Sequence, residues 1–369
     1  MAAQDETPAA APVCVHAATP AELEAARSAL EAQPLLAARA VAGQPEQHCR
    51  LAFPSPDGDA GIGTHCGSFS VQRFIAALQS RVLGRVLLTA AATPSTQVVV
   101  QENVARLPNG LVFVADKQYG GKGRSGNTWE SPDGCLMFSA VQRLAIPGQR
   151  LPFVQYIVSL AVVQAVQAEA AARLQGGAID VRIKWPNDVY AGGLKLGGIL
   201  CHSSYRDKLF HIIMGVGVNL SNRTPTTCID ELIAAAAAQR AAAAAAAPTP
   251  PGGGGGSGAP AARQPTSGVQ PVSREALLAG ILSRLEPMLE QLAAEGFEPF
   301  EAEYCRHWLH SDQQVQLEEG GRLVPVTVRG LSANGYLLAT DASGERYELH
   351  PDGNSLDFFN GLVRKKLPA

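Results

Sequence analysis

The sequence predicts an α+β fold: a mixed sheet with helices packed on one face, followed by a small all-β, barrel-like domain. Two observations lead to this prediction. Between about residues 84 and 219, one long helical pattern lies among many short apolar runs, and such a mixture favours a sheet covered by helices. From about residue 312, apolar residues recur at every second position, as at Val324, Val326 and Val328, which is typical of half-buried strands.

Composition divides the chain into segments. Residues 1–64 are rich in Ala, Pro, Gln and Gly and lack a long periodic pattern, so we expect a mostly disordered extension with at most one helix, near residues 20–42. Residues 65–311 form the main domain and residues 312–369 the β domain. Within the main domain, residues 231–272 hold alanine runs and five consecutive glycines. Such a segment buries too little to offset its ordering entropy, and we expect a surface insertion.

Strands of the main domain are expected where short apolar runs end at turn residues. After a short helix at 70–83, ordered α/β sequence should begin near Gly84. The turn signal Pro94-Ser95-Thr96 separates apolar runs at 86–88 and 98–100. Strands are predicted at 111–115, 136–140, 181–185, 196–200 and 210–219.

Two long helices are predicted. Apolar residues at helical spacing from Val154 to Val166 indicate the first, which should end near Gly176. Ser273 is a suitable N-cap for the second, and Pro287 should kink or shorten it.

The charge balance argues against two classes of partner. The 369 residues contain 30 basic and 33 acidic side chains, which gives no general attraction for nucleic acid or anionic lipid. No uninterrupted apolar run reaches the length of a membrane span. We therefore expect neither a nucleic-acid partner nor a membrane partner.

The cysteines and the N-terminus bear on the compartment. Seven scattered cysteines, none spaced as CxxC, fit reduced thiols better than a disulfide scaffold or a zinc site. Asp5, Glu6 and Glu22 precede the first arginine, Arg27, whereas a transit peptide is basic and poor in acids. The expected location is the cytoplasm.

A cationic, glycine-rich loop is the first candidate for a binding site. Gly121-Lys122-Gly123-Arg124-Ser125-Gly126 follows a predicted strand. The loop lacks the following helix of a dinucleotide fingerprint, and no Lys-Ser/Thr pair follows to make a phosphate-binding Walker loop. Glycine N–H groups and an arginine fork suit an oxyanion. A solvated loop with incidental charges explains the composition equally well.

Lys184-Trp185-Pro186-Asn187-Asp188 is the second candidate. Trp185 has a simple explanation as a core residue, and Asn187 and Asp188 as turn caps. Alternatively, Asn187 and Asp188 orient a ligand, or Asp188 helps to hold a metal ion bound to phosphate.

Four further residues stand in or beside apolar strands. Lys195 enters a buried strand, where its charge needs a partner, unless it lies at a surface edge. Gly215 and Gly217 lie on one face of another strand, which suggests either the close approach of a base or ribose, or a β-bulge. Asn219 ends that strand and could bind an adenine edge.

In this order, the pieces resemble the biotin–protein ligases, and among them the plant-type holocarboxylase synthetases. The resemblance covers about residues 84–369 apart from the insertion. Each motif is weak alone, and the joint pattern is specific. It rests on Pro94-Ser95-Thr96, Gln118, residues 121–132, 183–190, 195–200 and 215–219, and near the C-terminus on Tyr304, Trp308-Leu309-His310, 347–355 and 361–364.

The resemblance implies a class II synthetase-like catalytic domain with an SH3-like C-terminal domain. It implies that biotin and ATP, with Mg²⁺, form biotinyl-5′-adenylate, and that a lysine of a biotin carboxyl carrier domain of a carboxylase then takes the biotin. Lipoate–protein ligase, which shares the fold, and a non-catalytic biotin-sensing regulator are the alternatives.

The resemblance also assigns residues. Lys195 and Arg124 would be catalytic, and Trp129, Asn219, Gly217 and Arg124 would contact ATP. Lys122 departs from the arginine of bacterial relatives, so its hydrogen-bond geometry differs. Asp188 is a weak candidate for Mg²⁺. The implied biotin-binding residues are Ser95, Thr96, Gln118, Gly121, Lys122, Gly123, Arg124, Lys195 and Gly198.

Overall fold

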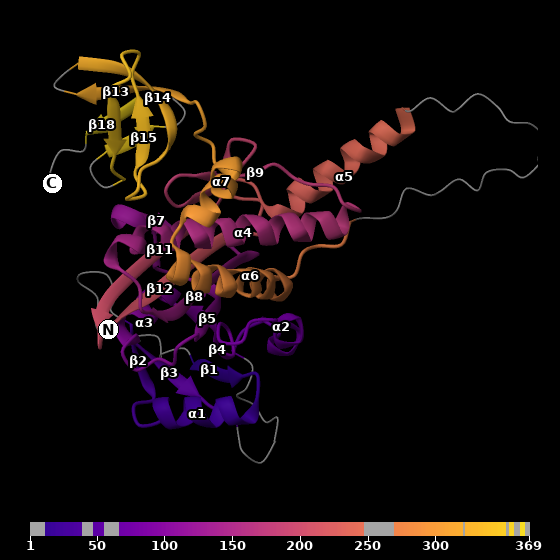
Figure 1. Ribbon diagram of the computed structural model, residues 1–369. Helices are drawn as coiled ribbons and strands as arrows, with labels where there is room; N and C mark the ends of the chain where they lie inside the picture. Colours follow the sequence, from indigo (N-terminus) through magenta and orange to yellow (C-terminus); the bar gives the residue numbers. More distant parts are fainter. Residues whose placement is uncertain are drawn as a thin grey trace, which may run out of the picture.

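The computed structural model describes residues 12–38, 47–54, 66–246, 269–319, 322–351, 354–357 and 362–365. In these residues a ten-stranded sheet runs through the main domain in the order β2-β3-β1-β4-β5-β8-β12-β11-β10-β9. β1 pairs in parallel with β3, as β4 does with β5, and the other pairs are antiparallel. The sheet is therefore mixed, as the sequence predicts (Figure 1).

The strands of this sheet are β1 (Pro12–Ala17), β2 (Leu35–Ala38), β3 (Gln47–Ala52), β4 (Val86–Thr93), β5 (Val112–Gln118), β8 (Cys135–Leu144), β9 (Val181–Lys184), β10 (Asp188–Ala191), β11 (Leu194–Arg206) and β12 (Leu209–Asn219). Its helices are α1 (Pro20–Leu30), α2 (Val71–Ala77), α3 (Thr96–Asn103), α4 (Leu151–Arg173), α5 (Ile229–Ala246), α6 (Arg274–Glu295) and α7 (Glu298–His307).

Helices cover both faces of the sheet, and the expectation of a single covered face is wrong. Side chains alternate between two cores because successive strand residues point to opposite faces. On β5, Val112 and Val114 join a core with α4 and α6, whereas Phe113 and Ala115 join a core with α1 and α3. Figure 1 shows α4 and α6 side by side, with α1 on the far side of the strands β1 and β3.

The expectation that residues 1–64 are mostly disordered is wrong for the part that the structure describes. β1, β2 and β3 extend the sheet beyond β4, and β1 pairs with it in the register Cys14–Thr89 to Ala17–Val86. Thr19 caps α1 by accepting a hydrogen bond from the N–H of Glu22. Ordered structure thus begins well before Gly84. The rest of that segment lies outside the described residues.

The cysteine expectation needs one correction. Cys14 on β1 and Cys66 form a disulfide, whereas Cys49, Cys135, Cys201, Cys228 and Cys305 are free thiols. The bond is possible because β1 joins the sheet next to β4 and so comes near the chain that leads into α2. Scattered spacing alone gave no sign of this pair.

The two long helices are where the sequence predicts them. α4 is long and apolar enough to cross a membrane by length and composition, and 67% of its most apolar window is buried inside the protein. Ser273 caps α6 by accepting from the N–H of Ala276. Pro287 does not shorten α6, which continues to Glu295. The helix at 70–83 is shorter than expected and ends at Ala77. The expected insertion begins with an ordered helix, α5.

The C-terminal domain is a six-stranded sheet in the order β16-β15-β14-β13-β18-β17. Its strands are β13 (Gln314–Glu319), β14 (Arg322–Leu331), β15 (Leu337–Thr340), β16 (Arg346–Leu349), β17 (Asn354–Asp357) and β18 (Leu362–Lys365). A turn at Gly335 joins it to the main domain. The Gly335 carbonyl accepts hydrogen bonds from Tyr156 Oη at 2.5 Å and from Trp185 Nε1 at 3.2 Å. Trp185 is thus a core residue that links the two domains.

Candidate active site

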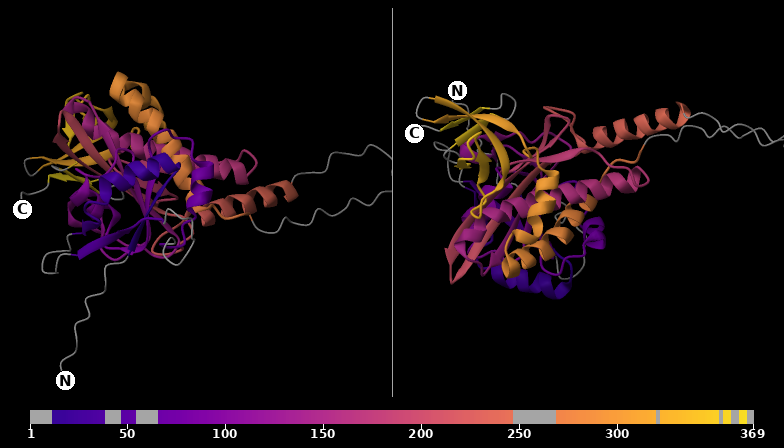
Figure 2. Two further views of the ribbon diagram at one scale, coloured as in Figure 1. Left: turned by 90° about the horizontal axis from the view of Figure 1, so that it is seen from below. Right: turned by 45° about the horizontal axis from the view of Figure 1, so that its top comes forward.

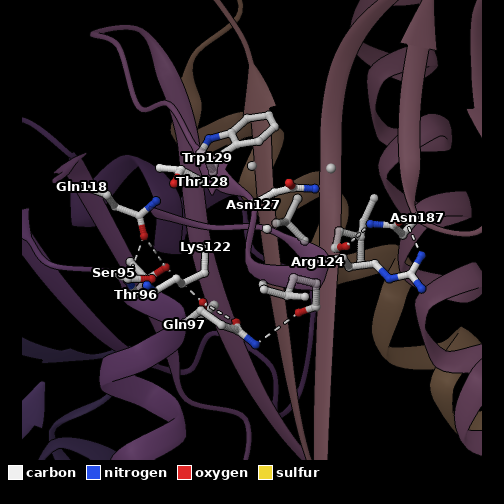
Figure 3. Close-up of a pocket in the computed structure, with 18 of the residues that line it drawn as sticks. Ser95, Thr96, Gln97, Gln118, Lys122, Arg124, Asn127, Thr128, Trp129 and Asn187 are labelled. Carbon is white, nitrogen blue, oxygen red and sulfur yellow. Dashed lines mark hydrogen bonds between the residues drawn. The ribbon is translucent and has the colours of Figure 1, made fainter. Parts of the chain in front are cut away.

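A cavity of about 270 Å³ opens where the start of α3, the glycine loop and strands β8 and β10–β12 meet. The loop consists of β6 (Gly121–Lys122), the short helix η1 (Arg124–Gly126) and β7 (Thr128–Trp129). Figure 3 shows labelled side chains from the start of α3, the end of β5, the glycine loop and the segment before β10 around one space. Of the residues predicted for the site, the cavity is lined by Ser95, Thr96, Gln118, Lys122, Gly123, Arg124, Trp129, Asp188, Lys195, Gly198 and Gly217.

One end of the cavity is polar and buried. The backbone N–H of Thr96 donates to Gln118 Oε1 at 2.8 Å, which joins the start of α3 to the end of β5. Ser95 is 1% exposed, and its hydroxyl has no hydrogen-bond partner. Burying a hydroxyl without a partner costs free energy. An unpaired hydroxyl facing a cavity is what a site needs in order to bind a polar ligand.

Lys195 also lines the cavity and is held by an ion pair. Its ammonium lies 2.8 Å from Asp188 Oδ1 and 5.8 Å from the centre of the Trp129 ring. β10 and β11 are neighbouring antiparallel strands, and Asp188 is directly opposite Gly198. A glycine at that position leaves room for the lysine, because a Cβ there would lie 3.6 Å from Lys195 Nζ. The charge partner that the sequence required for Lys195 is therefore Asp188.

Arg124 lies at the edge of the cavity. Its Nη1 donates to Asn187 Oδ1 at 3.1 Å, and Asn187 Nδ2 donates to the carbonyl of Ile199 at 2.8 Å (Figure 3). Arg124 also lines a second cavity of about 690 Å³ between α4, β11 and the C-terminal domain. Arg124 and Lys195 thus line one shared cavity, while Arg124 also faces the second.

The two glycines of β12 have different neighbours from those expected. A Cβ on Gly217 would lie 2.7 Å from Trp129 Cε2, so the indole ring rests on the strand at this point. A Cβ on Gly215 would collide with the side-chain amide of Gln97. Protein side chains therefore make the close approach in this structure, and neither glycine forms a bulge in the register of β12 with β11 and β8.

Trp129 Nε1 is buried without a hydrogen-bond partner. Together with the Ser95 hydroxyl, it leaves a second unpaired polar atom on a residue that lines the cavity. Both atoms are donors that a ligand could satisfy.

Two predicted residues do not line the cavity. Gly121 is buried against β7, where a Cβ would lie 2.5 Å from the Trp129 carbonyl, so its role is to let the loop strands pair. Asn219 is 4% exposed. Its Nδ2 donates to Thr226 Oγ1 at 3.0 Å, and its Oδ1 accepts from the Cys135 thiol at 3.4 Å. A contact between Asn219 and adenine stays a prediction.

Sequence reasoning missed several lining residues. It offered Asn187 and Gly215 as possible ligand neighbours but did not assign either of them to the site. Gln97 resembles an ordinary helix residue. Ser139 is a polar residue inside an apolar strand and is fully buried. That pattern was a usable signal, because a buried hydroxyl needs a partner. The lining residues that were not predicted for the site are Gln97, Asn127, Thr128, Phe138, Ser139, Asn187, Ile199, Leu200, Gly215 and Val216.

Comparison with known proteins defines the class. Residues 89–219 match the biotin/lipoate A/B protein ligase family, and this range holds the whole cavity. The fold is similar to that of a point mutant of the biotin protein ligase from Aquifex aeolicus in complex with biotin. That match has a TM-score of 0.52 and 23% identity, and it covers 71% of this chain and 94% of the other.

Curated relatives narrow the class. The chain is 40% identical to biotin–protein ligase 1, chloroplastic, and 39% identical to biotin–protein ligase 2, both from Arabidopsis thaliana. Each match covers 81% of this chain, with 74% and 83% of the relatives. The human biotin–protein ligase is 33% identical, with 38% of its length covered. The chain belongs to the biotin–protein ligases.

Proposed function

We propose that this chain activates biotin with ATP as biotinyl-5′-adenylate and transfers the biotinyl group to a lysine of a biotin carboxyl carrier domain of a carboxylase. Membership of the biotin–protein ligases supports the reaction. The observation that carries the site is the shared cavity, in which Lys195 and Arg124 lie with the unpaired hydroxyl of Ser95.

The reaction brings two anions together. A carboxylate oxygen of biotin attacks the α-phosphorus of ATP, an oxygen–phosphorus bond forms, and pyrophosphate leaves. Lys195 and Arg124 would offset the repulsion and stabilise the charge that develops on phosphorus. Holding both substrates in one cavity replaces a bimolecular encounter with an oriented one. In the second step the carrier lysine's amine attacks the acyl carbon, and AMP leaves.

The family implies Mg²⁺, and the residues present fit it in one way. Among the described residues, no group of three His, Cys, Asp or Glu side chains could hold a metal ion. One carboxylate, Asp188, lines the cavity. Mg²⁺ is commonly held by one or two carboxylates together with substrate phosphates. We propose that the ion enters with ATP, where it neutralises phosphate charge, and that Asp188 faces it while holding Lys195.

Ser95, Thr96 and Gln118 are the proposed contacts of the biotin ring, because they form the buried polar end of the cavity. Gly123, Gly198 and Lys122, which also line the cavity, would lie alongside the ligand. We propose that Trp129 and Gly217 mark the nucleotide end. The indole of Trp129 covers β12 where the adenosine would approach. Because the ring lies over Gly217, it could move aside without disturbing the packing of the core.

One reconstitution tests the function. The purified protein receives ATP, Mg²⁺ and either biotin or lipoate, with a biotin carrier domain as acceptor. We expect pyrophosphate exchange and acceptor labelling with biotin alone, read by a radiolabel assay and a streptavidin blot. A carrier domain with its lysine replaced by arginine is the control. Exchange with lipoate but not with biotin would overturn the proposal, and absence of exchange with both would leave only a biotin-binding regulator.

The compartment is a separate proposal. One Arabidopsis relative is named chloroplastic, and the other is named without a compartment. We propose the cytoplasm for this chain. A fluorescent fusion at the C-terminus, imaged in plant cells, should give a diffuse cytoplasmic signal, and a plastid signal would contradict the proposal.

A further inference from the structure

A line of hydrogen bonds runs from the polar end of the first cavity to the wall of the second. Thr96 Oγ1 lies 3.0 Å from Ser139 Oγ, and Ser139 Oγ lies 3.0 Å from Gln97 Oε1. Gln97 Nε2 lies 3.0 Å from Nδ1 of His202. Thr96, Gln97 and Ser139 are all at least 95% buried, so each proton in this line needs a defined place.

The neighbours of the Gln97 amide determine which group donates and which accepts along this line of hydrogen bonds. Gln97 Nε2 also lies 3.2 Å from the backbone carbonyl of Leu200, which only accepts hydrogen bonds. The nitrogen of the amide must therefore face Leu200, and its second proton goes to His202 Nδ1. His202 is then neutral and carries its proton on Nε2. Burial lowers the pKa of His202, which agrees with the neutral ring.

The direction propagates to Thr96. Gln97 Oε1 only accepts, so the single proton of the Ser139 hydroxyl points to it. Ser139 therefore cannot donate to Thr96, and the single Thr96 proton goes to Ser139 Oγ at 3.0 Å or to Gln118 Oε1 at 3.2 Å, both of which accept. The Thr96 oxygen is left with lone pairs and no proton for the cavity. It offers an acceptor to a ligand N–H group.

A separate observation indicates that the fold makes room for the Gln97 side chain at this particular position. Its amide occupies the space where residue 215 would carry a Cβ, so only a glycine on β12 lets this side chain pass between α3 and β11. An ordinary packing residue would not need a glycine in the middle of a central strand, where glycine weakens the structure.

We propose that Gln97 is a positioning residue that selects a cyclic urea over other ring systems. Held by His202 and Leu200, it orients the hydroxyls of Ser139 and Thr96 so that Thr96 accepts a hydrogen bond from a ureido N–H. The dithiolane ring of lipoate has no N–H, so it would leave this acceptor unpaired and pay for its burial. The proposal rests on biotin as the substrate of the proposed function.

The test uses Gln97→Met, which keeps the length of the side chain but lacks the amide. The probes are biotin and the two biotins methylated on one ureido nitrogen. We expect biotin affinity to fall roughly ten- to a hundredfold, since one oriented hydrogen bond is lost. For the methylated biotin that wild type rejects, the loss of affinity in the variant should be far smaller. The KM for ATP should stay within about twofold of wild type, because the hydrogen bonds of Gln97 go to Ser139, Leu200 and His202, whereas Lys195 pairs with Asp188.

A matched pair at position 202 gives a second readout, because the residue is exposed overall while its Nδ1 faces the buried Gln97 amide. His202→Phe keeps a ring but offers no acceptor, and it should resemble Gln97→Met. His202→Asn places an amide oxygen as many bonds from the backbone as Nδ1, and it should restore most of the biotin affinity. Gly215→Ala should also resemble Gln97→Met and should add nothing to Gln97→Ala.

The outcomes separate the two proposals. If wild type fails to bind biotin, the proposed function falls. If wild type binds biotin but Gln97→Met keeps the wild-type preference among the three probes, the positioning role falls alone. Equal losses for His202→Phe and His202→Asn would also overturn it, and melting temperatures show whether each variant is folded.

Discussion

At the scale of single residues, Lys195 has a defined partner and a defined direction. Asp188 holds its ammonium at 2.8 Å inside the cavity. We predict that Lys195→Ala slows adenylate formation by about two to three powers of ten, the usual cost of one preorganised charge-stabilising donor. Single-turnover formation of labelled adenylate from radiolabelled ATP measures this rate. Lys208→Ala is the control, because Lys208 is exposed at the turn between β11 and β12.

Arg124 calls for a different measurement, because it borders both cavities. Replacing it with alanine should impair retention of the adenylate as well as its formation, since the loop loses its hydrogen bond to Asn187. Free adenylate released into solution reports this leakage. Wild-type yield and wild-type release in Arg124→Ala would remove Arg124 from the site.

The sequence predicted the residues whose types are unusual where they stand. A lysine entering an apolar strand and an arginine among glycines both indicate charge near a ligand, and both line the cavity. Gln97 and Ser139 escaped because their importance depends on which atoms face each other across four elements. Asn219 was assigned from its place at the end of a strand and through the resemblance, and in the structure its side chain bonds to Thr226 and Cys135.

At the scale of elements, a buried carboxylate from α6 caps backbone N–H groups in the chain segment between α2 and β4. Glu286 accepts hydrogen bonds from the backbone N–H groups of Arg81, Val82 and Leu83 at 2.7 to 2.8 Å. Burial raises the pKa of Glu286, but these hydrogen bonds and the Arg81 side chain outweigh burial and lower it. The carboxylate therefore serves as the cap of this segment, although it comes from α6.

We predict that Glu286→Gln lowers the free energy of unfolding by about 1–3 kcal/mol, because three backbone N–H groups lose a charged acceptor. The sign with pH follows from the lowered pKa. The carboxylate stabilises the fold above its pKa in the unfolded chain, and this contribution is lost as pH falls through the folded pKa. Denaturant unfolding at pH 7 and pH 4 should show a smaller difference between variant and wild type at pH 4. An equal difference at both would contradict this account.

Elements with strong local patterns were predictable, and those defined by distant partners were not. The periodicity of α4 and the apolar runs of β5 and β8 are visible in the sequence. β1 and β2 have only six and four residues, and alanine gives no strand preference. Their stability comes from pairing that links β1 to β4, far along the chain, and no local pattern encodes that pairing.

At the scale of the whole molecule, one histidine joins the main domain to the C-terminal domain. His310 is fully buried, and its Nε2 accepts from the backbone N–H of Trp185 at 2.9 Å. Its Nδ1 lies 2.9 Å from Gln313 Oε1, which only accepts, so the ring is neutral. Burial lowers the pKa of His310 to about 4.

The folded protein should therefore lose stability in a defined window of pH. The unfolded chain binds a proton below about pH 6.5, whereas the folded chain resists it until about pH 4. Stability is fully present above that window and falls by up to about 3 kcal/mol across it. Unfolding curves between pH 7 and pH 4.5 measure the loss, and His310→Gln should remove this part of it. A variant with the wild-type slope would contradict the assignment.

The insertion is closed at its base, so we predict that its outer part is dispensable for catalysis. Val272 N–H donates to Asp230 Oδ1 at 2.9 Å, and the fully buried residues of α5 are Ile229 and Ile233, at its start. In Figure 2, α5 extends away from the domain. Replacing residues 243–268 with a flexible linker of about fifteen residues should leave kcat and KM within about twofold, since loop length adds little free energy. A larger loss of activity in a folded variant would give the insertion a function.

The position of Trp129 has an optical consequence. The chain has three tryptophans, and Trp185 and Trp308 are sealed in the interior at 5% and 4% exposure. Trp129 alone among them borders the cavity. The tryptophan fluorescence emission of the native protein should therefore shift when a ligand binds against β12, while the two interior rings contribute a constant background. Arrival of the nucleotide can be followed in real time without a dye.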